Sequence, residues 1–544
     1  MEKSGKYKII TNKNQYNLNL FMEDIEKRKG VLFNWITDNY DKTFLIILTA
    51  AFLIRLWIFF KTMNQPIWWD AGDYLSTAKR FGLGLDIRDT WYYRRGFFWP
   101  FFSAIFFKLG LGEVGLRLSE VLFSTGIVAA SYFLIKDMFN KKLALLTSLG
   151  LSFSWIFLFF SARPLTSIPA TFFLLTSLLF FWKGYVLKKG NKFLYLFGAF
   201  FALAILTRMQ YLMFVPVFLI FFFVKEKFRF IRNKQLWITL GIFALIITPQ
   251  MILHSQHYGN PLVDLVTYHL GIDQLSDVSK TGEVAGVGGF KTVFVYIKNL
   301  PYILDGNGAG YSSLFALSPI YFLFIIGFFY FFIDLFLGFD KIFKDEIVQK
   351  KFFIFLWVAF ALMFLGYIAP HLEQRYMMQT LPFLFLIAFS PFVILESFLI
   401  KKFKLKEFSI ILIILIILSL LLIPNIKFGN SLIDLKKTSY LEVQQAGIWL
   451  KENSNPQDVI LSDSQPQVQY YSERDTYTLS RNLSDFEVQI QELKPRFLMI
   501  SIFEPYPQWA YTYPQENQDM WVPIKAYEKD NQPVLIIYES NIRL

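Results

Sequence analysis

The chain has 544 residues, of which 54% are hydrophobic, and its mean hydropathy is +0.40. This composition excludes an ordinary soluble domain and is typical of a polytopic membrane protein. Basic cytoplasmic loops account for a formal charge of +12 in such a protein, so the charge is no sign of nucleic-acid binding. The sequence contains no cysteine, which excludes disulfides and thiolate metal sites.

The first 42 residues are polar and mixed in charge, without the early apolar core and cleavage site of a signal peptide. We therefore expect residues 1–42 to be a cytoplasmic segment. A helix needs about 20 apolar residues to cross a bilayer. Candidate runs begin near residues 43, 97, 118, 143, 165, 193, 211, 236, 313, 352, 377 and 408.

Short basic loops decide which runs cross. Five loops together hold 20 Lys or Arg against 6 acidic residues, so we expect all five on the cytoplasmic side. This works only if the run 97–111, which is short and contains Pro100 and Lys108, lies in the interface. Eleven spans then remain within residues 43–426, with the C-terminus outside. The loops are 136–142, 183–192, 225–234, 340–351 and 401–407.

The opposite side collects the unusual polar residues, in outer loops 61–117 and 254–311 and in the short segments 161–167, 206–211 and 369–376. The chain has only 32 residues between Lys192 and Lys225 in which to rise and return, so we expect Arg208 in a recess facing a cavity or an anion. The alternative is an arginine that snorkels to the headgroups. The polar residues of this side are Asp70, Asp73, Arg163, Arg208, His254, His257, His371, Glu373 and Arg375.

Residues 427–544 change to a polar, mixed composition. Helical spacing in "TSYLEVQQAGIWLKENS" is followed by strand-like runs such as "RFLMISIF" and "PVLIIYES". Alternating patterns of this kind predict a small extracytoplasmic α/β domain. The expected fold is therefore an all-α polytopic membrane bundle followed by this domain, in the cell membrane.

The stretch "PIWWDAGDY" follows directly on the first span. Asp70 and Asp73 lie at helical positions i and i+3 with Tyr74 beside them, so the two carboxylates share a face. They could hold a divalent metal, or one could act as a base while the other orients a substrate. Trp68 and Trp69 have an ordinary explanation as interface anchors. Further along, "WYYRRGFFWP" offers Arg94 and Arg95 to an anion at the membrane surface.

"PIWWDAGDYLSTAKRF" resembles the first outer loop of the GT-C glycosyltransferases, especially the protein O-mannosyltransferase-like group (glycosyltransferase family 39) that includes the aminoarabinose transferases of lipid A. Three further pieces are similar, and the resemblance covers roughly residues 44–425. "EQRYMMQTLPFL" (373–384) is like the family's Arg-Tyr element before a late helix. The other two are "RLSEVLFSTGIVAASYFLIKDMFNKKLALL" and "HYGNPL" (257–262).

The resemblance implies inverting transfer of a sugar, a mannose-like hexose or a similar unit, from a polyprenyl-phosphate donor to an outer acceptor hydroxyl. Asp70 matches the catalytic aspartate and would take the acceptor's proton. No cofactor is required, although a divalent cation could bind. The acceptor is a protein, glycan or lipid. Candidates for the phosphate are Arg95, Arg163, Arg208 and Arg375, with His371, Glu373 and Tyr376 around the same pocket; His371 could equally be a satisfied interface residue.

Two departures from the family pattern leave other functions open. Ala71 stands where the family has the glutamate of its Asp-Glu pair, and "SARPLTSIP" lacks the acidic residue that often follows the third span. An inactive scaffold that kept the fold is therefore one alternative. A flippase or transporter of lipid-linked glycans is another, although the polar residues cluster on one face rather than at the midplane.

Overall fold

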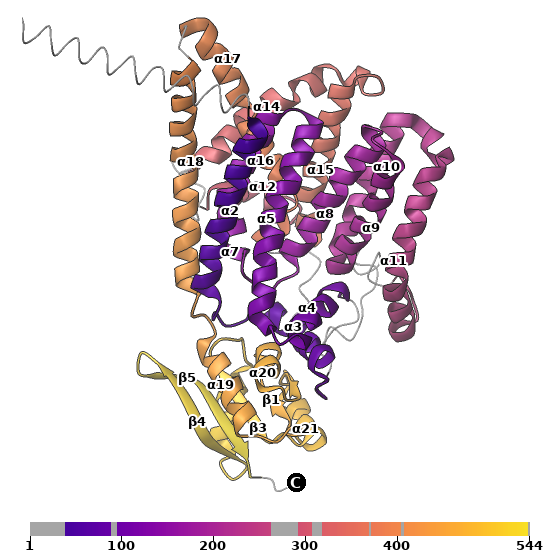
Figure 1. Ribbon diagram of the computed structural model, residues 1–544. Helices are drawn as coiled ribbons and strands as arrows, with labels where there is room; N and C mark the ends of the chain where they lie inside the picture. The colour runs from indigo at the N-terminus through magenta and orange to yellow at the C-terminus, as the bar shows by residue number, and fades with distance from the viewer. Residues whose placement is uncertain are drawn as a thin grey trace, which may run out of the picture.

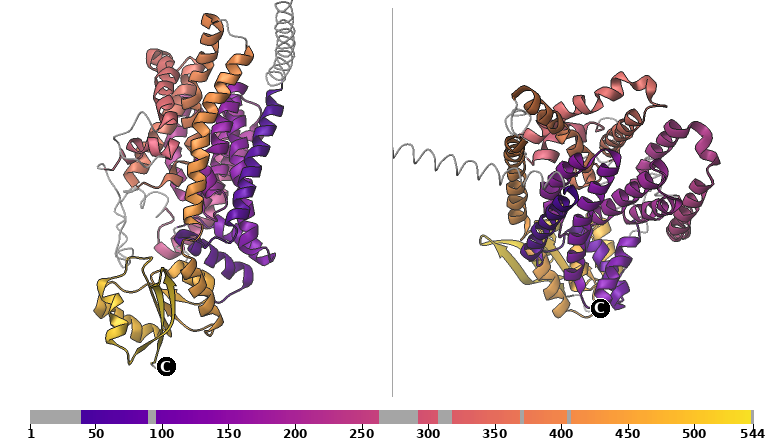
Figure 2. Two further views of the ribbon diagram at one scale, coloured as in Figure 1. Left: turned by 90° about the vertical axis from the view of Figure 1, so that its left-hand side faces the viewer. Right: turned by 45° about the horizontal axis from the view of Figure 1, so that its top comes forward.

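The computed structural model describes residues 39–88, 95–262, 292–306, 318–368, 372–403 and 407–541. A bundle of long helices stands on a small domain that contains the β-strands, and two perpendicular views place this domain at the same end of the bundle (Figures 1 and 2). The two parts match the predicted order of a helical membrane region followed by an α/β region.

Within the described residues, eight helical segments are long and apolar enough to cross a membrane. α16 and α17 form one of them, and α8 continues through a π-helical turn to Val186. The segments are built on α2 (Tyr40–Thr62), α5 (Gly112–Met138), α8 (Ser167–Phe181), α11 (Lys234–Tyr258), α14 (Pro319–Leu337), α15 (Glu346–Ile368), α16 (Leu381–Phe389) with α17 (Pro391–Phe403), and α18 (Glu407–Lys436).

Shorter helices occupy the other three expected crossings, so the count of eleven stays a prediction. They are α6 (Lys141–Phe153) with α7 (Trp155–Phe160), α9 (Asn191–Thr207) and α10 (Val215–Glu226). α6 and α7 are separated because Ser154 is extended, with φ −61° and ψ 128°. The freed N–H of Trp155 donates to Asn425 on α18 at 2.8 Å, which compensates for the break.

α3 (Trp69–Leu83) and α4 (Phe98–Lys108) lie at the end of the bundle that faces the small domain (Figure 1). α4 has 11 residues, too few to cross a bilayer at about 1.5 Å per residue. This agrees with the prediction that residues 97–111 do not span. Two short helices, α12 (Val295–Lys298) and α13 (Leu300–Asp305), precede α14.

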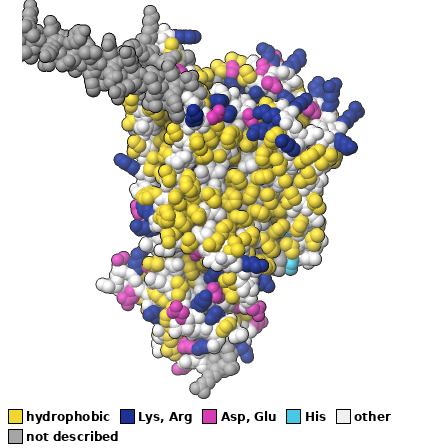
Figure 3. All heavy atoms as spheres, in the orientation of Figure 1, with side chains coloured by type: hydrophobic (Ala, Val, Ile, Leu, Met, Phe, Trp, Pro, Cys, Tyr) yellow, Lys and Arg dark blue, Asp and Glu magenta, His cyan; other side chains and the backbone are white. Residues whose placement is uncertain are grey.

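The surface of the bundle is an apolar belt, and Lys and Arg side chains gather at its end opposite the small domain (Figure 3). The loop after α14, which contains the exposed Lys341 and Lys344, is one of the five predicted to be cytoplasmic. The charge asymmetry is the pattern that the positive-inside rule describes. Which end faces the cytoplasm stays a prediction.

The small domain is built on a five-stranded sheet of order β2-β1-β3-β5-β4, in which β1 runs parallel to both neighbours and β5 antiparallel to both of its own. α18 continues to Lys436, past the boundary predicted at residue 427. The strands are β1 (Ile460–Leu461), β2 (Thr476–Tyr477), β3 (Phe497–Ser501), β4 (Trp521–Lys529) and β5 (Gln532–Ser540); the helices are α19 (Leu441–Glu452), α20 (Gln465–Ser472), α21 (Leu483–Leu493) and α22 (Tyr513–Glu516).

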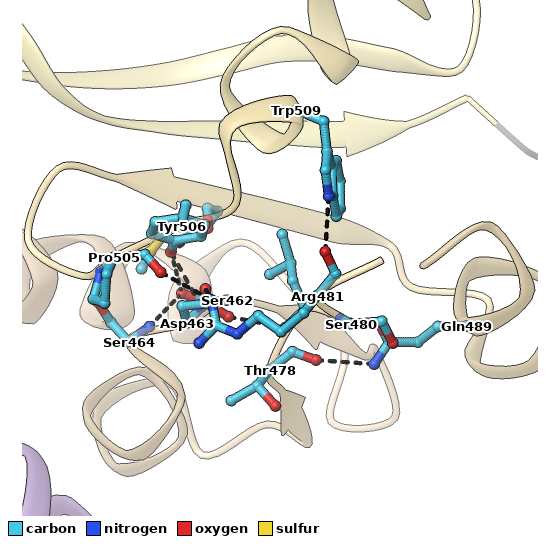
Figure 4. A network of polar contacts seen from close by, with 12 residues as sticks. Ser462, Asp463, Ser464, Thr478, Ser480, Arg481, Gln489, Pro505, Tyr506 and Trp509 are labelled. Atoms are coloured by element: carbon cyan, nitrogen blue, oxygen red, sulfur yellow. Dashed lines mark hydrogen bonds and ion pairs between the residues drawn. The ribbon is translucent and has the colours of Figure 1, made fainter. Parts of the chain in front are cut away.

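Alternation along the strands gives the sheet an apolar core on each face. Leu461 and Leu498 belong to one cluster, whereas Ile460 and Phe497 belong to the other. A polar network closes the ends of β1 and β2: the buried carboxylate of Asp463 accepts from the backbone N–H of Leu479 and from Arg481, each at 3.0 Å (Figure 4).

Candidate active site

The first two turns of α3 present both carboxylates of "PIWWDAGDY". The helix begins at Trp69 after an extended Trp68, and Asp70 and Asp73 follow at i and i+3 on one side. Their surroundings differ, since the side chain of Asp70 is 36% exposed and that of Asp73 only 3%. One carboxylate can therefore meet a substrate, while the other is held inside the protein.

Two arginines from distant segments converge on these carboxylates. Arg375 Nη2 lies 2.8 Å from Asp70 Oδ2, across a separation of 305 residues. Arg95 lies between the two aspartates, with Nη1 3.0 Å from Asp73 Oδ2 and Nη2 3.8 Å from Asp70 Oδ1. The structure thus brings together four residues from three segments that the sequence analysis singled out.

Arg208 completes the positive side of the cluster. It follows the end of α9 in extended backbone, and its guanidinium donates to Ser167 Oγ at 2.6 Å and to Gln210 Oε1 at 2.9 Å. The guanidinium also stacks 4.3 Å from the centre of the Tyr376 ring. Arg208 is close enough to Asp70 to stabilise its negative charge. The predicted turn therefore faces an anion.

The aromatic and acidic neighbours predicted for the pocket lie around this cluster. Glu373 Oε2 accepts from Arg375 Nε at 3.1 Å and fixes the plane of that guanidinium. The Arg95 guanidinium lies 5.1 Å from the centre of the Tyr74 ring. Together with Tyr376, these side chains form a half-buried wall around the carboxylate of Asp70.

The surroundings shift the pKa values of the two aspartates in opposite directions. Burial alone would raise the pKa of Asp70, but Arg375, Arg95 and Arg208 outweigh it and lower that pKa below its ordinary value. Burial dominates at Asp73 and, with the negative charge of Asp70, raises its pKa to about 6 despite Arg95. Asp70 is therefore a permanently ionised carboxylate near neutral pH, with cations beside it.

Three predicted site residues are not placed in this cluster. Arg94 and His371 lie outside the described residues. Arg163 is buried on the other side of Trp68, 3.9 Å from the centre of that indole ring, and forms no ion pair with a described residue. Among the described residues, no group of three His, Asp or Glu side chains is arranged to hold a metal ion.

Contacts from the small domain to α3 were not predicted. The Tyr471 hydroxyl accepts from the Ile67 N–H at 2.8 Å, just before the helix, and Lys79 pairs with Glu473 at 3.0 Å near its end. Gly72 lies against the backbone of Pro466, where a Cβ would come within 2.6 Å. The helix that carries both aspartates thus packs closely against α20, and no local sequence signal indicates this contact.

Residues 94–253 match the sequence pattern of the family described as dolichyl-phosphate-mannose-protein mannosyltransferase. The match covers 160 of the 544 residues. The resemblance found in the sequence is therefore confirmed, and it concerns glycosyltransferases of the GT-C class. No curated protein sequence is similar enough to the chain to count as a relative.

The fold of the chain is similar to that of two solved enzymes. ArnT from Cupriavidus metallidurans, bound to undecaprenyl phosphate, superposes with a TM-score of 0.61 at 12% identity, covering 91% of this chain and 97% of ArnT. The apo oligosaccharyltransferase from Archaeoglobus fulgidus gives 0.57 at 14% identity, covering 86% of this chain and 70% of that enzyme. Both likenesses establish the ArnT-like architecture of a multi-pass membrane protein.

Proposed function

We propose that this protein transfers a sugar from a polyprenyl-phosphate donor to an acceptor hydroxyl, on the side of the membrane that carries the small domain. The observation that carries the proposal is the ionised carboxylate of Asp70 beside the guanidinium groups of Arg375, Arg95 and Arg208. A base next to a patch of positive charge suits a reaction in which a hydroxyl loses a proton while a phosphate leaves.

The carboxylate of Asp70 is assigned the role of general base. It takes the proton of the acceptor hydroxyl, whose oxygen forms a bond to the anomeric carbon. The bond between that carbon and the phosphate oxygen breaks on the opposite face, so the configuration inverts. The leaving polyprenyl phosphate is a stable anion and needs no acid, which is why one carboxylate is sufficient where glycoside hydrolysis uses two.

The arginines are assigned to the phosphate. Arg375 holds Asp70 at 2.8 Å in the free protein, and a phosphate with more charge and more oxygens competes for the same guanidinium. Donor binding would then loosen the ion pair and leave Asp70 more basic when the acceptor arrives. Binding of the donor would thereby raise the basicity of Asp70.

An apolar groove offers a place for the prenyl chain of the donor. It measures about 620 Å³ between α9, α10 and α11, and its lining includes Leu212, four residues after Arg208, as well as Phe230 in the basic loop after α10. Leu219 and Leu240 in the groove are about half exposed, so the groove opens to the lipid. A chain lying there would keep its phosphate near the arginine cluster.

Transfer by the purified protein in liposomes tests the proposal. Labelled polyprenyl-phosphate sugars are offered with a membrane extract as acceptor source, and Asp70→Asn is compared with Asp86→Asn, an exposed aspartate of the same outer loop. We expect Asp70→Asn to lower the rate by about 10² to 10⁴, as for loss of a general base, and Asp86→Asn to leave it unchanged.

Each other outcome points to a different reading. An unchanged rate in Asp70→Asn removes this residue as the base. Movement of labelled lipid across the bilayer without any product indicates a transporter. Failure of every donor to give product with the wild type indicates a scaffold that lacks catalysis.

A further inference from the structure

A small space lies behind the first turn of α3, apart from the arginine cluster. Its volume is about 10 Å³, room for the centre of one water-sized sphere. The methyl group of Ala71 is the only side chain that this turn contributes besides Trp68, so the chain itself does not fill the space. The remaining lining residues are Gln65, Pro66, Ile67, Arg117, Arg163, Pro164 and Leu165.

Arg163 supplies an uncompensated positive charge to this space. The residue is 4% exposed, and its guanidinium lies between the Trp68 and Phe159 rings, 3.9 and 3.6 Å from their centres. Both rings attract the positive charge through their π-electrons, but neither offers a hydrogen-bond acceptor in the manner of an oxygen atom to the N–H groups. Both terminal nitrogens, Nη1 and Nη2, have no hydrogen-bond partner among the residues that the structure describes.

Among the described residues, no carboxylate forms an ion pair with Arg163, and the buried carboxylate of Glu120 lies near Arg117 instead. Arg117, which also lines the space, forms an ion pair with Glu113, with Nε 2.7 Å from Oε1. Its terminal nitrogens also donate to the carbonyl oxygens of Thr62, Gln65 and Ala162. The helix α3 also directs the unpaired N–H groups of its first turn toward its own N-terminus. A buried guanidinium beside a second one and a helix N-terminus is costly without a counter-ion.

We propose that this space binds a monatomic anion such as chloride, held by the Nη1 and Nη2 groups of Arg163 beside Arg117 and the first turn of α3. The residues that line this space include none of Asp70, Arg95, Arg208 and Arg375, so this site is separate from the one assigned to the donor. The anion neutralises Arg163 and fixes the turn that carries Asp70. It therefore positions Asp70 without touching a substrate.

Two measurements that need no activity test the site. Crystals grown in bromide should show an anomalous peak beside Arg163. Thermal unfolding in nanodiscs, at constant ionic strength with gluconate replaced by chloride, should shift Tm upward by about 2 °C or more, because the anion binds the folded state. Arg163→Gln should lose this shift, and the exposed Arg229→Gln should retain it.

The inference fails if the bromide crystals show only an ordered water at Arg163, or if Arg163→Gln keeps the full chloride dependence. The crystallographic measurement uses the wild type, so a variant that does not fold leaves the test intact. Neither readout involves sugar transfer, so failure here leaves the proposed function untouched, and failure of transfer leaves the anion site untouched.

Discussion

Asp70 and Asp73 stand one helical turn apart, yet only one of them is suited to be a base at neutral pH. Cations outweigh burial at Asp70 and lower its pKa, whereas burial outweighs Arg95 at Asp73 and raises its pKa to about 6. The two residues therefore titrate in different ranges of pH. The difference comes from exposure and from the position of Arg375, neither of which spacing along the sequence reveals.

The titration of Asp73 predicts the pH profile of transfer. Above about pH 6 its carboxylate holds Arg95 beside Asp70, and below that pH it becomes neutral and releases Arg95. We expect the rate to be level from pH 8 to about 6 and to fall on the acidic side, while Asp70 stays ionised. Initial rates of the wild type and of Asp73→Asn, measured between pH 4.5 and 8, check this. The variant is expected to show a low rate that does not change over this range. An inflection that survives in Asp73→Asn would assign it to another group.

Replacement of Arg375 by lysine tests the assignment of the phosphate. Arg375 contacts Asp70 through Nη2 and Glu373 through Nε. Lysine keeps the charge, but its single ammonium group cannot reproduce this two-sided geometry. We expect the KM for the donor to rise about tenfold with a smaller loss in kcat. Arg496→Lys, at a surface ion pair of the small domain, is the matched control and should change neither constant. Equal KM values for Arg375→Lys and wild type would place the phosphate elsewhere.

The sequence could indicate most members of the site, because membrane topology limits where charged residues are tolerated. Asp70, Arg208 and Arg375 were found through their common side of the membrane and motif. Arg163 came from the same reasoning, yet its guanidinium packs against the rings of Trp68 and Phe159 instead of joining the cluster. Topology fixes the side of the membrane on which a residue lies, but not the direction of its side chain.

At the scale of the elements, the position of α3 depends on close packing that only glycine permits. Gly72 faces Pro466 of α20, and Gly96 faces the backbone carbonyl of Leu206 at the end of α9. A Cβ at either position would meet backbone rather than a flexible side chain. These contacts fix α3 against the small domain and fix the segment of Arg95 against the bundle.

We expect Gly72→Ala to push α20 away from α3. The added Cβ would lie 2.6 Å from the Pro466 carbonyl carbon, so the two helices must separate or tilt. Faster hydrogen exchange in residues 465–472 and a rate of transfer lowered by about tenfold are the expected results. Gly241→Ala on α11, where a Cβ meets nothing within 4 Å, should change neither. Unchanged exchange in Gly72→Ala would show that the contact is not important for docking.

Element type was predictable and element breaks were not. Apolar length identified the long helices, and short apolar runs identified the strands β3 and β5, because both signals are local. The interruption at Ser154 depends on the side chain of Asn425, which compensates for it from 270 residues away. Such a partner cannot be read from the segment that it interrupts.

At the scale of the whole molecule, the distribution of charge predicts its orientation in the membrane. The chain has no cysteine, so single cysteines can be introduced and labelled without background. We expect Asp485→Cys in the small domain to react with an impermeant maleimide added outside intact cells, and Lys344→Cys to react only after permeabilisation. Both positions are exposed. The reverse pattern would invert the topology and contradict the assigned side of the reaction.

Late segments of the chain contact early ones in the folded protein. The ammonium group of Lys61, at the end of α2, contacts Asn430 at 2.7 Å and Asp434 at 2.8 Å on α18, and α20 clamps α3. Ribosomes complete Asp70 hundreds of residues before Arg375 and Pro466 exist. A nascent chain therefore carries Asp70 without its Arg375 partner, and α3 without its contact to α20, until these later segments have been synthesised.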